Sequence, residues 1–120
     1  MLDFSNLKNL HTIESNVFNG AFETTNCQLF ILPGCLRTLG GGAISYNNNV
    51  IFTTVQIGGP EDPSQLQSIG YQAIKQNASR HLVQNLVIYV EDEGNVPTAI
   101  RKALDSGDLE YEAELSIVQA

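Results

Sequence analysis

The chain has 120 residues, of which 42% are hydrophobic and 16% charged. Its 13 acidic residues against 6 Lys and Arg give a net charge of −7, which argues against nucleic-acid polymers and membrane surfaces as partners, because both attract basic proteins. The length predicts one domain over residues 1–120. Because the chain starts without a cationic and apolar leader, we expect a cytoplasmic protein.

Strand signals dominate the first half of the chain. Strands are predicted at residues 11–18, 21–25, 27–32 and 49–57. Asn19-Gly20 joins the first two, because Asn-Gly is the strongest two-residue hairpin signal. The later two are apolar or β-branched runs that Pro33-Gly34 and Gly58-Gly59 bring to an end.

The clearest helix signal covers residues 62–82. Asp62 is a natural N-cap, Pro63 stands at the first helical position, and Gln65 completes a capping box. A hydrophobic stripe runs through Leu66, Ile69, Ala73, Ile74, Ala78 and Leu82. This spacing predicts one buried face of a helix.

The last third alternates strand, helix and strand. Residues 85–91 are apolar on both faces, which is typical of a central strand. A second helix is predicted over 96–107, capped by Asn95 and ended by Gly107. A last strand over 109–118 is predicted to turn one face inward (Leu109, Tyr111, Ala113, Leu115 and Ile117) and its glutamates outward.

These elements predict an α/β or α+β fold. We expect a single-domain mixed β-sheet with N-terminal hairpins and a C-terminal β-α-β-α-β unit over residues 50–118, with two main helices packed on the sheet. Strands joined through a helix should be parallel. No internal repeat is apparent. Aromatic residues on exposed hairpins favour a homo-oligomer.

The order of "LFILPGCLRTLGGGAI", "TTVQIGGPED", a helix, "NLVIYV", a second helix and a last strand resembles a macro domain over residues 28–118. The resemblance implies an α/β fold that binds ADP-ribose or a related nucleotide in Gly-rich loops. The chain departs from the family at Pro33-Gly34-Cys35, where asparagines are usual. It also carries Glu91-Asp92-Glu93-Gly94 where the family has a Ser/Thr-Gly-rich phosphate loop.

The first functional hypothesis is a small non-enzymatic module that binds an anionic or nucleotide-like molecule. Backbone N–H groups in Gly-rich loops, together with an arginine, favour phosphate or carboxylate. The predicted ligand-binding residues are Arg37, Gly40, Gly41, Gly42, Gly58 and Gly59. The alternative reading of Gly40 to Gly42 is a connection between two strands, without a ligand.

The second hypothesis is an acidic protein–protein interaction module, such as an inhibitor, an adaptor or an immunity-type protein. In this hypothesis Glu110, Glu112 and Glu114 dock on a basic partner surface; the alternative is a solvated face. A third hypothesis is an enzyme that uses Cys35, although no base can be placed beside it. Cys27 and Cys35 otherwise read as buried or half-buried thiols. No catalytic residue, metal ligand or cofactor is assigned.

Overall fold

The computed structural model describes residues 1–18, 25–44, 50–75 and 83–120, and all structural statements concern these residues. They form eight strands and one helix. In chain order these are β1 (Leu2–Asp3), β2 (Thr12–Ile13), β3 (Thr25–Leu32), β4 (Thr38–Leu39), β5 (Val50–Ile57), β6 (Ser68–Ile69), β7 (Val83–Val90), α1 (Thr98–Ser106) and β8 (Glu114–Gln119).

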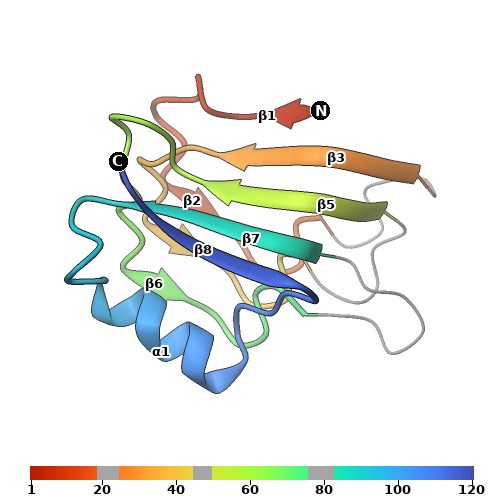
Figure 1. The fold of residues 1–120 in the computed structure, drawn as a ribbon. Coiled ribbons are helices and arrows are strands. Elements are labelled where there is room, and N and C mark those ends of the chain that lie inside the picture. Colours follow the sequence, from red (N-terminus) through yellow and green to blue (C-terminus); the bar gives the residue numbers. More distant parts are fainter. Residues whose placement is uncertain (19–24, 45–49, 76–82) are drawn as a thin grey trace.

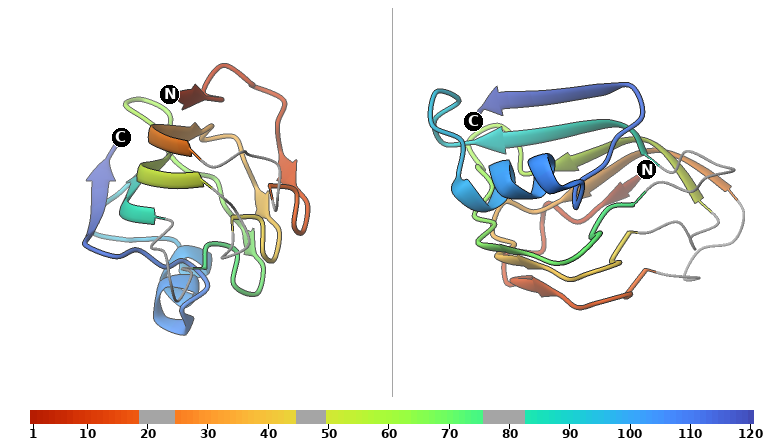
Figure 2. Two further views of the ribbon diagram at one scale, coloured as in Figure 1. Left: turned by 90° about the vertical axis from the view of Figure 1, so that its right-hand side faces the viewer. Right: turned by 90° about the horizontal axis from the view of Figure 1, so that it is seen from below.

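The strands form two sheets that face each other (Figures 1 and 2). The large sheet has the order β1-β3-β5-β7-β8, the small sheet has the order β2-β4-β6, and every pair in both is parallel. The chain therefore passes from one sheet to the other and back, and each circuit stacks on the one before. We call each circuit a coil, and the arrangement is a parallel β-solenoid.

Helix α1 replaces a small-sheet strand in the last full coil. It lies beside β6 and continues the stack formed by β2, β4 and β6 (Figure 2). The helix begins after Pro97, which makes no side-chain cap hydrogen bond, and ends at Gly107, whose φ is 81°. Glycine is favoured at such a left-handed position because it has no Cβ.

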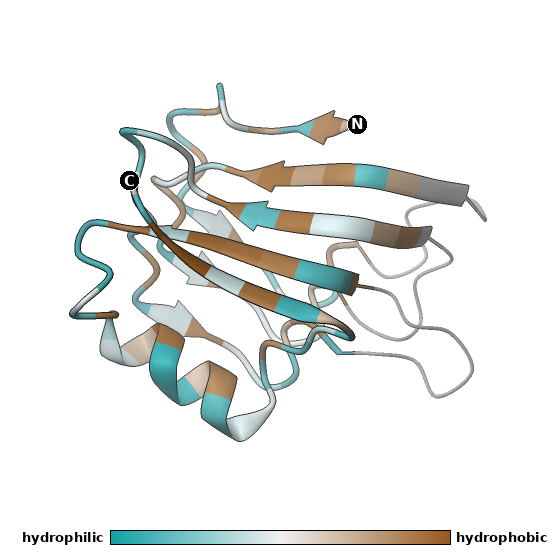
Figure 3. Cartoon of the chain, viewed as in Figure 1, coloured by the Kyte–Doolittle hydropathy of each residue, from teal (hydrophilic) through white to brown (hydrophobic). Residues whose placement is uncertain are grey.

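The core lies between the two sheets and is built from columns of aligned residues. The register sets Phe30, Val55 and Leu86 side by side, and likewise Leu32, Ile57 and Ile88. All six side chains are fully buried. Figure 3 shows the hydrophobic residues of β3, β5 and β7 in brown. Burying columns of large apolar side chains is the main favourable term in the stability of such a fold.

Two consecutive residues point outward in each of these three strands. Gln28-Leu29, Thr53-Thr54 and Gln84-Asn85 are exposed or half-buried between buried neighbours. The strict alternation expected of a strand is broken there, and the same break recurs in each coil.

The solenoid has an internal repeat, which corrects the prediction that there is none. The register aligns Thr38-Leu39 with Ser68-Ile69, and Ile44 with Ile74. At this spacing "PGCLRTLGGGAI" over 33–44 matches "PSQLQSIGYQAI" over 63–74 at five positions, which in the first segment are Pro33, Leu36, Gly40, Ala43 and Ile44. Each identical residue occupies the same position in successive coils, as expected of a sequence repeat in a solenoid.

The predicted mixed sheet with N-terminal hairpins is wrong. Strand β2 pairs with β4, and β3 pairs with β1 and β5, in parallel throughout. Within the described residues, the predicted strand over 11–18 is limited to Thr12–Ile13. The turn at Asn19-Gly20 and most of the strand over 21–25 lie outside the described residues.

The predicted helix over 62–82 is also wrong for residues 62–75, which form a turn, β6 and the next corner. Its hydrophobic stripe arises because Leu66, Ile69 and Ile74 face the core from different parts of one coil. Asp62 does not cap a helix; its carboxylate Oδ2 accepts a 3.0 Å hydrogen bond from the N–H of Gly34. Residues 76–82 lie outside the described residues.

The two-helix α/β architecture, and with it the macro-domain resemblance, is therefore wrong. The described residues hold one helix on a parallel solenoid. That helix is too short and too polar to span a membrane. The strands predicted at 27–32, 49–57 and 85–91 and the second predicted helix are confirmed within a few residues as β3, β5, β7 and α1. The parallel pairing of β7 and β8 through α1 is also confirmed.

The last strand is shorter than predicted. It begins at Glu114, whereas Leu109 is buried in a bridge to Ile74. Tyr111 and Ala113 are exposed instead of facing the core. The chain turns onto the large sheet only after these residues, and a period of two in the sequence cannot locate that turn.

Candidate functional site: the acidic end of the solenoid

Gly40, Gly41 and Gly70 lie where the backbones of neighbouring coils approach each other closely. A Cβ on Gly70 would lie 2.2 Å from the N atom of Gly41, and one on Gly40 would lie 2.4 Å from the N atom of Ser15. Neither position has room for a side chain. The close stacking of coils thus accounts for these glycines in structural terms, as a corner that only small residues can form.

The same corner of successive coils holds a ladder of left-handed backbone positions. Asn16, Gly42 and Gln72 have φ angles of 61°, 65° and 51° at equivalent places in successive coils. The N–H of Asn16 donates to the carbonyl of Gly41 (3.1 Å), and the N–H of Gly42 donates to the carbonyl of Tyr71 (3.2 Å). Each coil therefore supplies the acceptor for the coil before it.

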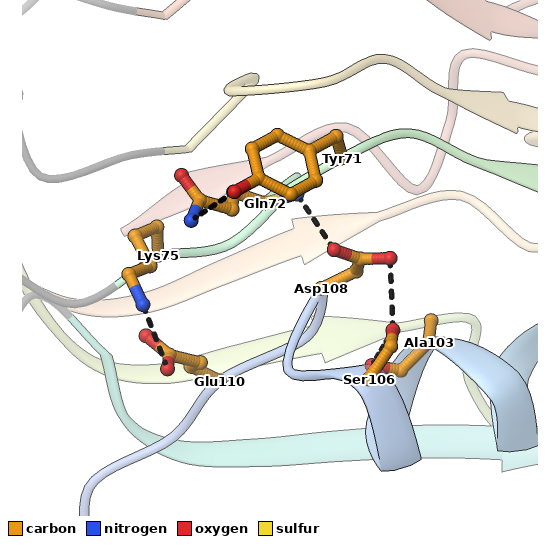
Figure 4. A network of polar contacts seen from close by, with 7 residues as sticks. All are labelled: Tyr71, Gln72, Lys75, Ala103, Ser106, Asp108 and Glu110. Atoms are coloured by element: carbon orange, nitrogen blue, oxygen red, sulfur yellow. Dashed lines mark hydrogen bonds and ion pairs between the residues drawn. The ribbon is translucent and has the colours of Figure 1, made fainter.

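Asp108 ends this ladder (Figure 4). The N–H of Gln72 donates to Oδ1 of Asp108 at 2.8 Å, and the hydroxyl of Ser106 donates to Oδ2 at 2.9 Å. A carboxylate takes the place of the next coil's carbonyl, and both of its oxygens accept hydrogen bonds. Sequence reasoning missed Asp108, because its role appears only once the repeat is aligned.

The six predicted ligand-binding residues lie at different turns of the coil. Gly58 and Gly59 are in the turn after β5, where their N–H groups donate to Leu32 and Asp62. Arg37 is exposed before β4, and Gly40 to Gly42 follow that strand. Strand β5 of the large sheet thus lies between the two glycine groups along the chain, and the ligand site remains a prediction.

The three predicted docking glutamates occupy different environments. Glu110 is half-buried and its Oε2 accepts a 3.3 Å ion-pair contact from Nζ of Lys75 (Figure 4). Glu112 and Glu114 are exposed. Only Glu114 belongs to β8, where it lies in register with Asn85. The pair that faces solvent is therefore Glu112 and Glu114.

Charge is distributed unevenly along the solenoid. Residues 83–120, which we call the acidic coil, contain eight Asp and Glu but only two Lys and Arg. The preceding 82 residues contain five acidic and four basic residues. Most of the net charge of −7 thus lies at one end of the stack, where it creates a negative field.

The acidic loop after β7 is tied to the end of β8. Glu91, Asp92 and Glu93 are exposed there, in the hydrophilic loop of Figure 3. The N–H of Glu93 donates to Oε1 of Gln119 at 2.9 Å, and Nε2 of Gln119 donates to the carbonyl of Glu91. A single glutamine, which sequence reasoning missed, therefore holds these carboxylates beside the last strand.

A pocket of about 530 Å³ is lined by this loop and the start of α1. Its lining includes Glu91 and Asp92, together with Pro97, Thr98 and the buried Ser64. The pocket has the size and charge to take the end of a Lys or Arg side chain.

Strand β8 leaves the core less covered than the other long strands do. Leu115 and Ile117 continue the two core columns after Leu86 and Ile88, yet they are only half-buried whereas Leu86 and Ile88 are fully buried. In the described part of the chain β8 is the last strand of the large sheet, so only β7 pairs with it.

The two cysteines are free thiols. Cys27 is buried in the core, and Cys35 is half-buried with Sγ 3.3 Å and 3.4 Å from the carbonyls of Leu7 and Leu10. Both therefore match the prediction of buried or half-buried thiols. Across the described ranges, no group of three or more His, Cys, Asp or Glu side chains is placed to hold a metal ion.

Comparisons with protein-family models, with curated proteins and with solved structures find no match for this chain.

Proposed function

We propose that this protein is a non-catalytic interaction module whose acidic coil docks on a basic surface of a partner protein. The observation that carries the proposal is the charge asymmetry, with eight acidic and two basic residues in the last coil against five and four in the rest. A field of this kind raises the rate of association with a cationic partner and orients it.

Several acidic residues of the acidic coil are exposed on its surface. Glu112 and Glu114 are exposed just before and at the start of β8, and Asp105 is exposed on α1. Of the two cations in this coil, Arg101 is turned to its own helix: Nε contacts the carbonyl of Val96 and Nη2 contacts Oγ1 of Thr98.

The acidic surface is also held in place before a partner arrives. Gln119 fixes the loop of Glu91 and Glu93, and Asp108 is held by Gln72 and Ser106. Less conformational freedom is lost on binding when the contact groups are already ordered, and affinity rises accordingly.

The test is the binding of a fluorescent Lys-Lys-Gly-Ser-Gly-Ser-Gly-Lys-Lys peptide, followed by anisotropy at several salt concentrations. Glu112→Lys/Glu114→Lys should weaken binding by about tenfold or more at low salt, and added salt should weaken wild-type binding, because the attraction is screened. Glu14→Lys, on an exposed residue of the first coil, is the matched control and should change affinity much less. Equal effects of the acidic-coil and first-coil variants would refute the proposal.

A further inference from the structure

We propose that the outer edge of β8, which pairs with no strand of the described residues, binds its basic partner as an added β-strand. The added strand alternates apolar residues and carries Lys or Arg at both ends. This inference rests on the proposed function and names the form in which the partner binds. It combines three independent features of the acidic coil: the open edge, the uncovered core columns and the positions of the carboxylates.

The first feature is the backbone of β8. Its register with β7 is unbroken from Asn85–Glu114 to Val90–Gln119. The N–H of Ala120 donates to the carbonyl of Val90 at 2.9 Å. In a parallel strand, alternate residues direct both N–H and C=O to the same neighbour. Ser116 and Val118 therefore bond to β7, whereas Leu115, Ile117 and Gln119 direct theirs to the open edge.

The second feature is the pair of half-buried core residues on this strand. Each preceding coil is covered by the next, and its residues in these two columns are fully buried. Leu115 and Ile117 are packed against the same core but are only half-buried. An added strand with apolar residues at alternate positions would cover them as β8 covers Leu86 and Ile88.

The third feature is the distribution of carboxylates along β8. Glu112 and Glu114 lie at its beginning, and the loop of Glu91, Asp92 and Glu93 is tied to its end through Gln119. Six residues of strand span about 20 Å at about 3.3 Å per residue. A strand laid along this edge therefore meets negative charge at both ends and an apolar stretch between them.

The acidic residues at both ends of β8 determine which kind of strand can bind at its edge. Acidic residues at the ends of an edge strand discourage pairing with neutral or acidic strands. They favour a strand whose flanking residues are cationic, because opposite charges beside each other stabilise the pairing of strands. A segment of the type Lys-Lys-Val-Thr-Val-Thr-Val-Lys-Lys satisfies the backbone, the apolar columns and the charges together.

The experiment compares this peptide with Lys-Lys-Gly-Ser-Gly-Ser-Gly-Lys-Lys, which has the same charge but neither apolar side chains nor a preference for strand. Added-strand binding predicts that the valine peptide binds about tenfold or more tightly. It also predicts that N-methylation of one set of alternate amides abolishes this advantage, while N-methylation of the other set leaves it within about twofold, because only one set faces β8.

Variants of the protein complement the test with modified peptides. Ile117→Thr should weaken binding of the valine peptide several-fold and leave the glycine peptide unaffected. Val87→Thr is the control, since Val87 is a half-buried residue one strand further in, on a position between the core columns. Both variants are first checked by circular dichroism and thermal unfolding, and the peptide pairs decide the question if Ile117→Thr does not fold.

Three results would overturn the inference, and they differ in whether they also refute the proposed docking function. Equal binding of both peptides that Glu112→Lys/Glu114→Lys abolishes would refute strand addition and leave the proposed docking function intact. No binding of either peptide would refute both. Self-association of the protein that Ile117→Thr abolishes would place a second copy on this edge in place of a basic partner.

Discussion

The backbone N–H of Gln72 donates a 2.8 Å hydrogen bond to Oδ1 of Asp108, where the earlier coils use a backbone carbonyl from the next coil. The last left-handed corner of the solenoid is thus closed by a side chain (Figure 4). This contact joins the repeating part of the molecule to the acidic coil.

Replacing Asp108 with Ala should destabilise the protein by about 1–3 kcal/mol, because the part-buried N–H of Gln72 loses its acceptor. Asp108→Asn keeps an oxygen for Gln72 and should cost less. Asp105→Ala, on the exposed face of α1, should stay within about 0.5 kcal/mol. Urea unfolding measures all three; equal loss in Asp108→Ala and Asp105→Ala would contradict the capping role.

Gly70→Ala should be among the most damaging small substitutions in the chain. Its Cβ would lie 2.2 Å from the N atom of Gly41, a backbone atom that cannot move without separating two coils. We expect a loss of about 2–3 kcal/mol or more, in line with overpacking. In Gly59→Ala the nearest atom is the side-chain Nε2 of Gln56 at 3.6 Å, so its midpoint in thermal unfolding should barely change.

Gln72→Gly should stabilise the protein. Gln72 has a φ of 51°, and this left-handed conformation costs a residue with a Cβ about 1–2 kcal/mol. Glycine removes that strain, but it gives the unfolded chain more conformational freedom, which lowers the free energy of unfolding by about 0.4–1 kcal/mol. The equivalent position in the preceding coil is Gly42. We expect a net gain of about 0.5–1 kcal/mol in urea unfolding, whereas Gly42→Ala should lose stability. A less stable Gln72→Gly variant would contradict this prediction and show that contacts of the Gln72 side chain stabilise the protein by more than its backbone strain costs.

The pKa of Asp3 lies below its ordinary value of 3.8, because it accepts hydrogen bonds from the side chain and then the backbone of Ser5. A lowered pKa means that the ionised carboxylate contributes stability above the unfolded value, and that this contribution is lost as the pH falls through the lowered pKa. Titration of the Asp3 carboxyl by NMR should give a midpoint below 3.8, and Ser5→Ala should raise it. An unchanged midpoint in Ser5→Ala would contradict this cause.

The long strands could be predicted from the sequence, because short apolar or β-branched runs form buried strands in many folds. In this fold the runs lie on the inner face of the solenoid. The sequence also locates α1, where Pro97 and Gly107 bracket an amphipathic segment. These features are local, and local patterns are what a single sequence reports best.

The path of residues 62–75 was wrongly predicted as a helix, because the coil is encoded by a repeat of about 30 residues and not by the 3.6-residue spacing of a helix. Leu66, Ile69 and Ile74 have helical spacing, yet the match between 33–44 and 63–74 shows that the same residues recur as corners of a coil. That alignment would also have explained Gly40 and Gly70 as packing residues. The roles of Asp108 and Gln119 depend on neighbours distant in sequence and were not predictable from their own surroundings.

The most direct test of the account is NMR mapping of the Lys-Lys-Gly-Ser-Gly-Ser-Gly-Lys-Lys peptide on the isotopically labelled protein. Docking at the acidic coil predicts that amide shifts concentrate in residues 91–93 and 105–119 and spare the first coil. Shifts centred on Arg37 and Gly40 to Gly42, or spread evenly over the surface, would contradict it.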